Sequence, residues 1–249
     1  MTKLMIILGS VREGRIGGPI AEWVKAAADA DDRYEVDFVD LAELNLPLMD
    51  EPNHPRLKNY VKDHTKAWSA RVEAADGFIF VFPEYNYSYS PAIKNALDYL
   101  HSEWDRKPVG FVNWGGNSAG TRAQVALRVV VSALGLVMTK GNVEINFPQK
   151  QLTDDGVFEP SEQQSAVVKA QLDEIDGAGP KKIDSDDRNQ EQLQLAATDP
   201  NFDFTVEAKQ LTINHQNLNE VKVSYYLMDV ELLFSRNPFV QQFRGQFSL

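Results

Sequence analysis

The feature that most constrains the fold is a regular alternation of short apolar segments with amphipathic segments over the first 175 residues. Most of the apolar segments are apolar throughout rather than at every second position, as is typical of strands buried on both faces of a sheet. The segments between them have helical spacing. The expected strands are residues 3–8, 34–39, 78–82, 108–114 and 143–147, and the expected helices are 19–30, 64–75, 91–101, 121–134 and 161–175.

This alternation predicts a parallel sheet with helices on both faces. Five strand–helix units fit one doubly wound α/β domain, for which we expect the flavodoxin-like strand order 2-1-3-4-5. Ligands bind such sheets beyond the carboxyl ends of the strands, where the strand order reverses. In this order the loops after the first, third and fourth strands meet there, and these three loops therefore form the candidate site.

The loop after the first strand is GSVREGRIGGP, residues 9–19. Its glycines permit close approach of backbone to a ligand, and the helix that follows directs its N-terminal amides toward the loop. Ser10, Arg12 and Arg15 could bind a phosphate. The loop lacks the motifs of dinucleotide and ATP sites, which favours a mononucleotide phosphate. Taken alone, it is equally well explained as a flexible turn with solvated arginines.

The loops after the third and fourth strands are PEYNYSYSP, residues 83–91, and WGGNSAGTRA, residues 114–123. Pro83 is expected to end sheet pairing, so that the following amides can meet the edge of a planar ring beside flat tyrosine faces. Two adjacent glycines in the other loop allow a ring to lie against backbone. Alone, these loops could be a tyrosine-rich surface loop and a plain turn. Together with the phosphate loop they describe an FMN pocket.

These motifs resemble those of the NAD(P)H-dependent FMN reductase family, a flavodoxin-like group that also holds quinone, chromate and azo-dye reductases. The resemblance covers residues 1 to about 175 and rests on Gly9-Ser10-Val11-Arg12, on Pro83-Glu84-Tyr85-Asn86 with Ser88, and on PAIKNALD, residues 91–98. It implies an FMN-dependent enzyme that passes hydride from NADPH or NADH to quinones, free flavin or similar small-molecule acceptors. It also implies a homodimer or homotetramer.

The resemblance further implies which residues contact FMN. The first loop would surround the phosphate, the 83–88 loop would meet the isoalloxazine edge through backbone amides, and residues 114–117 would lie on the pyrimidine side. No side-chain acid or base is needed, and the expected donor near flavin N5 is a backbone amide of Tyr85 or Asn86. The expected cofactor-binding residues are Ser10, Arg12, Arg15, Ile16, Gly17, Pro83, Glu84, Tyr85, Asn86, Tyr87, Ser88, Trp114, Gly115, Gly116 and Asn117.

Two charged features near these motifs have simpler interpretations. Glu84 is expected to hydrogen-bond locally or to cross a subunit interface. Lys94 and Asp98 stand four apart on a predicted helix, where a solvated ion pair is the favoured interpretation.

Composition excludes several other classes of function. The net charge of −11 disfavours nucleic acid and anionic membranes as partners. The chain has no cysteine, which excludes thiol nucleophiles, disulfides and thiolate metal sites, and its four histidines lack metal-binding spacing. We therefore expect no metal. The apolar run at the start is too short for a signal peptide or a membrane span, so we expect a cytoplasmic protein.

The character of the sequence changes after Asp176. Residues 176–192, DGAGPKKIDSDDRNQEQ, have the composition of a linker. Beyond it, apolar residues alternate at Phe202, Phe204 and Val206 and again near Val221, which predicts strands. We therefore expect a reductase domain at 1–176 and a linker with a strand-rich extension at 177–249. The extension could be a dimerisation arm, a lid over the flavin or part of a fused β-rich module.

Two rival functions remain open at this level. One is a flavodoxin-like electron carrier without pyridine-nucleotide turnover, which the acidic composition favours slightly and the arginines of the first loop disfavour. The other is a flavin-free interaction protein whose function lies in the C-terminal extension.

Overall fold

The structure is a computed structural model that describes residues 1–177, 201–207 and 210–216. The chain divides into two compact units, Met1–Lys181 and Lys182–Leu249, called here unit 1 and unit 2. This division lies five residues beyond the boundary expected at 176, since unit 1 ends at Lys181.

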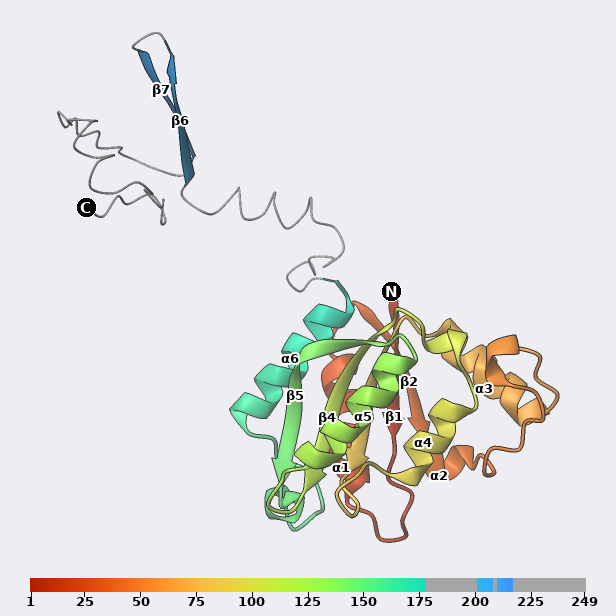
Figure 1. Ribbon diagram of the computed structural model, residues 1–249. Helices are drawn as coiled ribbons and strands as arrows, with labels where there is room; N and C mark the ends of the chain where they lie inside the picture. Colours follow the sequence, from red (N-terminus) through yellow and green to blue (C-terminus); the bar gives the residue numbers. More distant parts are fainter. Residues whose placement is uncertain (178–200, 208–209, 217–249) are drawn as a thin grey trace, which may run out of the picture. The chain divides into compact units, whose positions relative to one another are not determined.

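Unit 1 contains a five-stranded parallel sheet in the order β2-β1-β3-β4-β5 (Figure 1). The predicted flavodoxin-like fold is therefore confirmed. Its central strand β3 is buried at all seven positions, as its unbroken apolar sequence predicted. The strands are β1 Thr2–Leu8, β2 Tyr34–Asp40, β3 Gly77–Pro83, β4 Pro108–Gly115 and β5 Val137–Asn146.

Helices cover both faces of this sheet, and two apolar layers result (Figure 1). One layer packs α3, α4 and α5 against the sheet around Trp104, whose ring centroid lies 5.0 Å from that of Phe78. The other packs α1 and α6 against Leu4, Ile6 and Leu8. The helices are α1 Gly17–Asp29, α2 Leu41–Leu44, α3 Asp63–Ala74, α4 Pro91–Asp98, α5 Thr121–Ala133 and α6 Glu162–Ile175, and the 3-10 helices are Pro55–Leu57, Ser102–Trp104 and Pro148–Gln151.

Three details differ from the sequence-based expectation. α4 ends at Asp98 rather than at 101. β5 begins at Val137 instead of 143, and the register of its pairing with β4 shifts between Val109 and Phe111. The buried amide of Gln171 on α6 donates to the carbonyl oxygens of Phe111 and Gly141, both at 2.9 Å, and so satisfies two strand carbonyls beside this irregularity.

The third difference concerns the end of β3. Pro83 does not end the sheet pairing, because it is still paired with Trp114 and the amide of Glu84 still donates to the Trp114 carbonyl at 2.8 Å. Residues of a strand alternate in the side to which they hydrogen-bond. Pro83 therefore faces the β1 side, where β1 has already ended at Leu8, and its missing N–H breaks no ladder bond.

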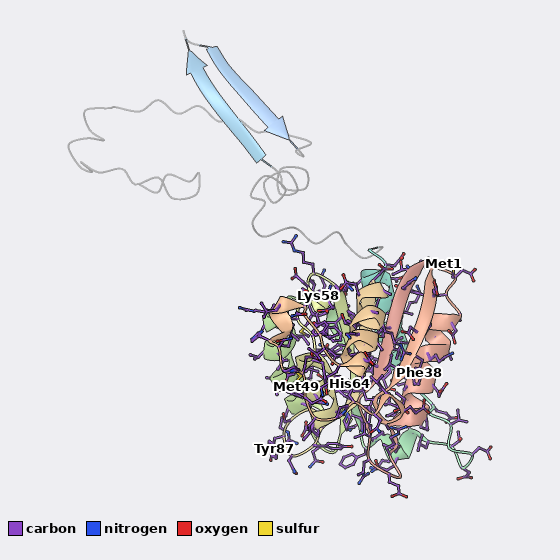
Figure 2. The ribbon with its side chains drawn as sticks, turned by 90° about the vertical axis from the view of Figure 1, so that its right-hand side faces the viewer. Met1, Phe38, Met49, Lys58, His64 and Tyr87 are labelled. Carbon is purple, nitrogen blue, oxygen red and sulfur yellow. The ribbon has the colours of Figure 1, made fainter. Side chains whose placement is uncertain are left out.

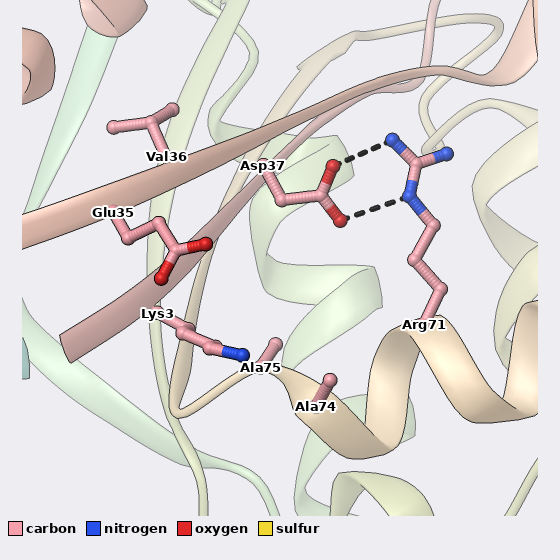
Figure 3. Close-up of a pocket in the computed structure, with 7 residues that line it drawn as sticks. All are labelled: Lys3, Glu35, Val36, Asp37, Arg71, Ala74 and Ala75. Carbon is pink, nitrogen blue, oxygen red and sulfur yellow. Dashed lines mark hydrogen bonds and ion pairs between the residues drawn. The ribbon is translucent and has the colours of Figure 1, made fainter. Parts of the chain in front are cut away.

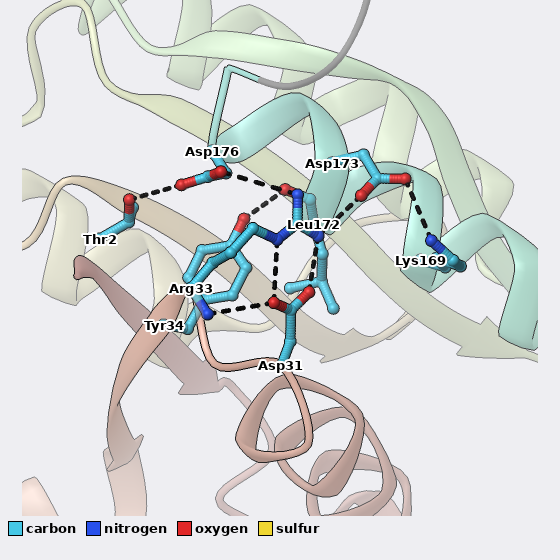
Figure 4. A network of polar contacts seen from close by, with 8 residues as sticks. All are labelled: Thr2, Asp31, Arg33, Tyr34, Lys169, Leu172, Asp173 and Asp176. Atoms are coloured by element: carbon cyan, nitrogen blue, oxygen red, sulfur yellow. Dashed lines mark hydrogen bonds and ion pairs between the residues drawn. The ribbon is translucent and has the colours of Figure 1, made fainter.

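A group of polar and charged residues, called here the α6 clasp, ties the end of α6 to the beginning of the sheet (Figure 4). Its members are Thr2, Asp31, Arg33, Asp173 and Asp176. The guanidinium of Arg33 lies 2.6 Å from Asp31 and 2.7 Å from Asp173, while the Thr2 hydroxyl donates to Asp176 at 2.7 Å. Thr2 is the first residue of β1, so the clasp is at the end of the sheet opposite the strand-following loops.

Unit 2 contains an antiparallel hairpin of β6 Asn201–Glu207 and β7 Gln210–Gln216. The strand predicted from Phe202, Phe204 and Val206 is thus present as β6. The second alternating segment, near Val221, lies outside the described residues.

Candidate functional site

The loops that follow β1, β3 and β4 lie together at one edge of the sheet, the lower edge in Figure 1. Figure 2 shows Tyr87 of the second loop at the opposite end of unit 1 from Met1. Contacts join the loops, since the hydroxyls of Ser10 and Tyr85 are 3.4 Å apart and the Glu84 amide donates to the Trp114 carbonyl at 2.8 Å. The fold therefore brings the three predicted loops into one site.

The first loop presents unpaired backbone donors. The amides of residues 10–14 donate no hydrogen bond to any other group of the described chain. α1 then starts at Gly17. Its N-cap residue is Ile16, and no side chain of the described chain hydrogen-bonds to the free amides at this end of the helix. The first amides of a helix carry a partial positive charge and are a favourable place for an anion.

Glycine is required where this loop approaches its neighbours. A Cβ on Gly9 would lie 2.4 Å from Cδ1 of Ile93, and a Cβ on Gly17 would lie 2.7 Å from the ring of Trp114. The Trp114 side chain is buried beneath the start of α1, and its carbonyl accepts from the Glu84 amide, so Trp114 supports the loop rather than facing outward from it. Ile16 packs against the same apolar layer.

The two arginines of the first loop have different surroundings. Arg15 forms a two-pronged ion pair with Asp40, a nearly buried residue at the end of β2, and donates to the Ser10 carbonyl at 2.6 Å. Arg12 is exposed and has no ion pair within the described part of the chain. Arg15 thus holds the loop against β2, and Arg12 is the cation available to a ligand.

The second loop forms a two-residue turn. Tyr85 and Ser88 exchange backbone hydrogen bonds of 2.8 and 2.9 Å, and the residues between them, Asn86 and Tyr87, have φ angles of +46° and +70°. Left-handed conformations at both central residues are typical of a type I′ turn. Asn is well suited to this region, whereas a bulky residue such as Tyr87 rarely adopts it.

This turn determines which amides remain for a ligand. The Tyr85 amide is used within the turn, while the amides of Asn86 and Tyr87 have no partner in the described chain. Of the two donors predicted for flavin N5, Asn86 is therefore the one left free. That assignment stays a prediction.

The third loop is shaped by glycines and by one residue that sequence analysis missed. A Cβ on Gly120, which has a φ of +88°, would lie 2.7 Å from the side chain of Asn113. Asn113 is fully buried on β4, and its amide donates to the carbonyl of Ala119 at 3.0 Å, which fixes the return of the loop. Asn113 is a polar residue inside the apolar run PVGFVNWG, and this position could have indicated its structural role from the sequence.

Glu84 connects the second loop to the third. Its carboxylate, 7% exposed, accepts hydrogen bonds from the Ser118 hydroxyl at 2.8 Å and from the Arg122 backbone amide at 3.2 Å. The Arg122 guanidinium donates to the same carboxylate at 2.7 Å. The local hydrogen bonds expected of Glu84 are thus present, at the N-terminus of α5 where a negative charge is stabilised.

The helix with the motif PAIKNALD, α4, holds the loop of residues 45–50 in place through hydrogen bonds. Asn95 donates to the Pro47 carbonyl at 2.7 Å and accepts from the Met49 amide at 2.9 Å. Tyr99 donates to Asp50 at 3.0 Å, and burial together with that carboxylate raises the pKa of Tyr99 to about 12. Lys94 and Asp98 form the expected solvated ion pair.

A surface cavity of about 270 Å³ lies elsewhere in unit 1 (Figure 3). It is near the beginnings of β1 and β2, away from the three loops, and Arg71 there is paired with Asp37 at 2.6 and 2.8 Å. We therefore assign it no role in the site. Its lining residues are Lys3, Glu35, Val36, Asp37, Arg71, Ala74 and Ala75.

The described residues match what FMN requires of a site. The first loop offers free amides, a helix N-terminus and Arg12 for a phosphate, and the second offers two free amides for a ring edge.

No helix in the described ranges is long and apolar enough to span a membrane.

Comparison with known proteins gives separate results for the two parts of the chain. Residues 200–249 match the model of the AbpF seventh immunoglobulin-like domain. Actin-binding protein F of Dictyostelium discoideum is 38% identical over 84 residues, which are 32% of this chain and 4% of that protein.

Residues 2–150, more than half of the chain, match the model of the NADPH-dependent FMN reductases. An NAD(P)H-dependent FMN reductase of Schizosaccharomyces pombe is 35% identical, over 64% of this chain and 80% of that protein. A 2-hydroxy-1,4-benzoquinone reductase of a Burkholderia species is 30% identical, over 55% and 73%. The structure of FerB, an NAD(P)H:(acceptor) oxidoreductase of Paracoccus denitrificans, has a TM-score of 0.59 at 22% identity and covers 72% of this chain and 100% of that one. The chain belongs to the NADPH-dependent FMN reductase family.

Proposed function

We propose that unit 1 binds FMN at the three loops and oxidises NADPH or NADH, with quinones, free flavin or similar small molecules as acceptors. The observation that carries the proposal is the meeting of the three loops at the carboxyl ends of β1, β3 and β4, with donors that have no partner in the described chain. Membership of the FMN reductase family supports the cofactor and the electron donor. The Burkholderia benzoquinone reductase supports quinones as acceptors.

Each loop has a distinct role in this proposal. Arg12, Ser10 and the amides at the start of α1 bind the phosphate, while Arg15 holds their loop in place. The amides of Asn86 and Tyr87 bind the edge of the ring, with Asn86 as the donor to N5. The backbone of Gly115, Gly116 and Asn117 lies against the pyrimidine side. Bound FMN would supply the redox chemistry, taking hydride from NADPH or NADH and passing the two electrons on to the acceptor, so the protein needs no acid or base of its own.

The visible spectrum of the purified protein tests this function. We expect flavin absorbance as purified or after FMN addition, followed by bleaching on anaerobic addition of NADPH. Protein that shows no flavin absorbance and binds no added FMN contradicts the proposal.

An electron carrier without NAD(P)H turnover is the second candidate, favoured only by the acidic composition. Steady-state oxidation of NADPH with menadione distinguishes the two. Repeated turnover excludes the carrier, whereas flavin that binds but is not reduced by either nicotinamide cofactor supports it.

We also propose that the protein acts in the cytoplasm, as its short initial apolar run suggested, and that it forms a homodimer or homotetramer, as the family resemblance implies. Light scattering on the purified protein gives the assembly directly, and a monomer at micromolar concentration contradicts that part of the proposal.

Unit 2 has a separate role in this proposal, as an immunoglobulin-like interaction module. Its match to an immunoglobulin-like domain and its antiparallel hairpin support this role. Protein that ends at Lys181 should therefore keep full FMN affinity and NADPH turnover. Loss of either property would show that unit 2 contributes to the reductase.

A further inference from the structure

The turn at Asn86 and Tyr87 contains a side chain in an unfavourable backbone conformation. Tyr87 has a φ of +70°, and a bulky residue stays there only when its surroundings hold it. Its ring is not held by burial, because the residue is 71% exposed. The contact that remains is with Arg122, whose guanidinium carbon lies 3.8 Å from the centre of the Tyr87 ring.

Arg122 is itself held in place. The carboxylate of Glu84 accepts from Nε of Arg122 and lies 2.7 Å from a second guanidinium nitrogen. A planar guanidinium bound in this way presents its flat face in a fixed direction, and that face is the one stacked on Tyr87. The chain of contacts thus runs from a nearly buried carboxylate, through Arg122, to the exposed ring of the turn.

We propose that Arg122 is a positioning residue for the cofactor. By stacking on Tyr87 it holds the turn in its left-handed conformation and keeps the free amides of Asn86 and Tyr87 in place for the flavin ring. This inference rests on the cofactor site proposed above. The charge of Arg122 is not itself the ligand, since Glu84 neutralises it.

Arg122→Met tests this role because methionine keeps the length of the side chain and removes the planar cation. We expect the dissociation constant of FMN, measured by fluorescence quenching on titration with apoprotein, to rise about tenfold, or about 1.4 kcal/mol. The thermal midpoint of the apoprotein should fall, because Glu84 loses its guanidinium partner, but the protein should stay folded at the temperature of the titration, since Glu84 keeps its hydrogen bonds from Ser118 and from the Arg122 backbone amide. Arg128→Met is the matched control, because Arg128 is exposed on α5 and has no ion pair in the described chain. It should leave both values unchanged.

A double-mutant cycle with Tyr87→Gly identifies the route by which Arg122 acts. Glycine adopts a positive φ without penalty, so the turn then needs no stacking partner. In the Tyr87→Gly protein, Arg122→Met should raise the dissociation constant by less than about twofold. A full tenfold effect there, or no effect in the wild-type background, overturns the proposal.

Two further measurements separate this inference from the proposed function. Arg122→Lys keeps the charge without the planar fork and should restore FMN affinity only partly. Cleavage of the apoprotein by chymotrypsin next to Tyr87 requires no cofactor, and we expect Arg122→Met to accelerate it while Arg128→Met does not. If the wild type binds no FMN, the proposed function fails, and unchanged cleavage would show that the turn does not depend on Arg122 either.

Discussion

At the scale of single residues, the first loop contains two arginines whose substitution should have different consequences. Arg12 is exposed without an ion pair in the described chain, so Arg12→Ala should weaken FMN binding about tenfold and leave apoprotein stability within about 0.5 kcal/mol. Arg15→Ala leaves Asp40 without its guanidinium, and should lower the free energy of unfolding by about 1–3 kcal/mol.

FMN titration and urea unfolding of the two apoproteins check this pair of predictions. If Arg15→Ala changed only FMN affinity, Arg15 would contact the phosphate directly, as the sequence alone suggested. If Arg12→Ala bound FMN normally, the phosphate would depend on backbone amides and Ser10.

Tyr85 is a further residue whose role the geometry limits. Its hydroxyl is 3.4 Å from that of Ser10, longer than a normal hydrogen bond between hydroxyls. Tyr85→Phe should therefore change the rate of flavin reduction by NADPH by no more than about twofold, as for a substitution worth about 0.5 kcal/mol. Stopped-flow absorbance measures this rate. Loss of reduction with FMN still bound would place the phenol in the chemistry.

At the scale of elements, Gln171 supports the irregular pairing of β4 and β5 from α6. Gln171→Leu removes the donor for two strand carbonyls, and should lower the free energy of unfolding by about 2 kcal/mol or more. Denaturant unfolding measures the loss. Gln163→Leu, at an exposed position of the same helix, is the control and should have little effect. Equal stability of the two variants would show that the carbonyls find other donors.

The sequence predicted the helices and strands better than it predicted individual contacts. The five parallel strands and all five long helices followed from the alternation of apolar and amphipathic segments, because strands buried on both faces have a distinctive composition, and the strand order was that of the flavodoxin-like fold type. The first half of β5 was missed, since it contains Thr139, Lys140, Gly141 and Asn142 at the edge of the sheet. α2 was missed because one helical turn has little periodicity, and it depends on Asp40 as its N-cap.

The candidate site was predictable as three loops but not as individual contacts. The pairing of Arg15 with Asp40 joins the ends of two strands, and sequence spacing carries no information about it. The use of the Tyr85 amide inside a turn follows from φ angles at Asn86 and Tyr87, which the pattern PEYNYS does not specify. Glu84 acts through a contact with Ser118, 34 residues away, which forms only once the sheet is assembled, and the bond of Asn113 to the Ala119 carbonyl depends on how the loop turns back on β4.

At the scale of the whole molecule, the α6 clasp should make the stability of unit 1 depend on acid pH. The hydrogen bond from Arg33 lowers the pKa of Asp31 to about 2, and the same guanidinium lowers the pKa of Asp173. A carboxylate with a depressed pKa contributes stability above its unfolded pKa of about 3.9 that is lost as the pH falls toward the folded value.

Thermal unfolding of the apoprotein between pH 5 and pH 2 therefore checks the clasp, in a window set by these two pKa shifts. The midpoint of the wild type should fall across this range, and that of Arg33→Met should start lower at pH 5 and fall less. Parallel curves for the two proteins would show that the clasp carries none of the acid sensitivity.

The clasp also has a consequence for how this reductase can be joined to other domains. Its charges tie the last helix of unit 1 back to the first strand through residues that all lie between Thr2 and Asp176. The contacts of the clasp therefore all lie within the sequence that precedes unit 2. We expect a different C-terminal domain attached after α6 to leave every contact of the clasp in place, so that the reductase fold could be joined to new domains without a change to its own residues.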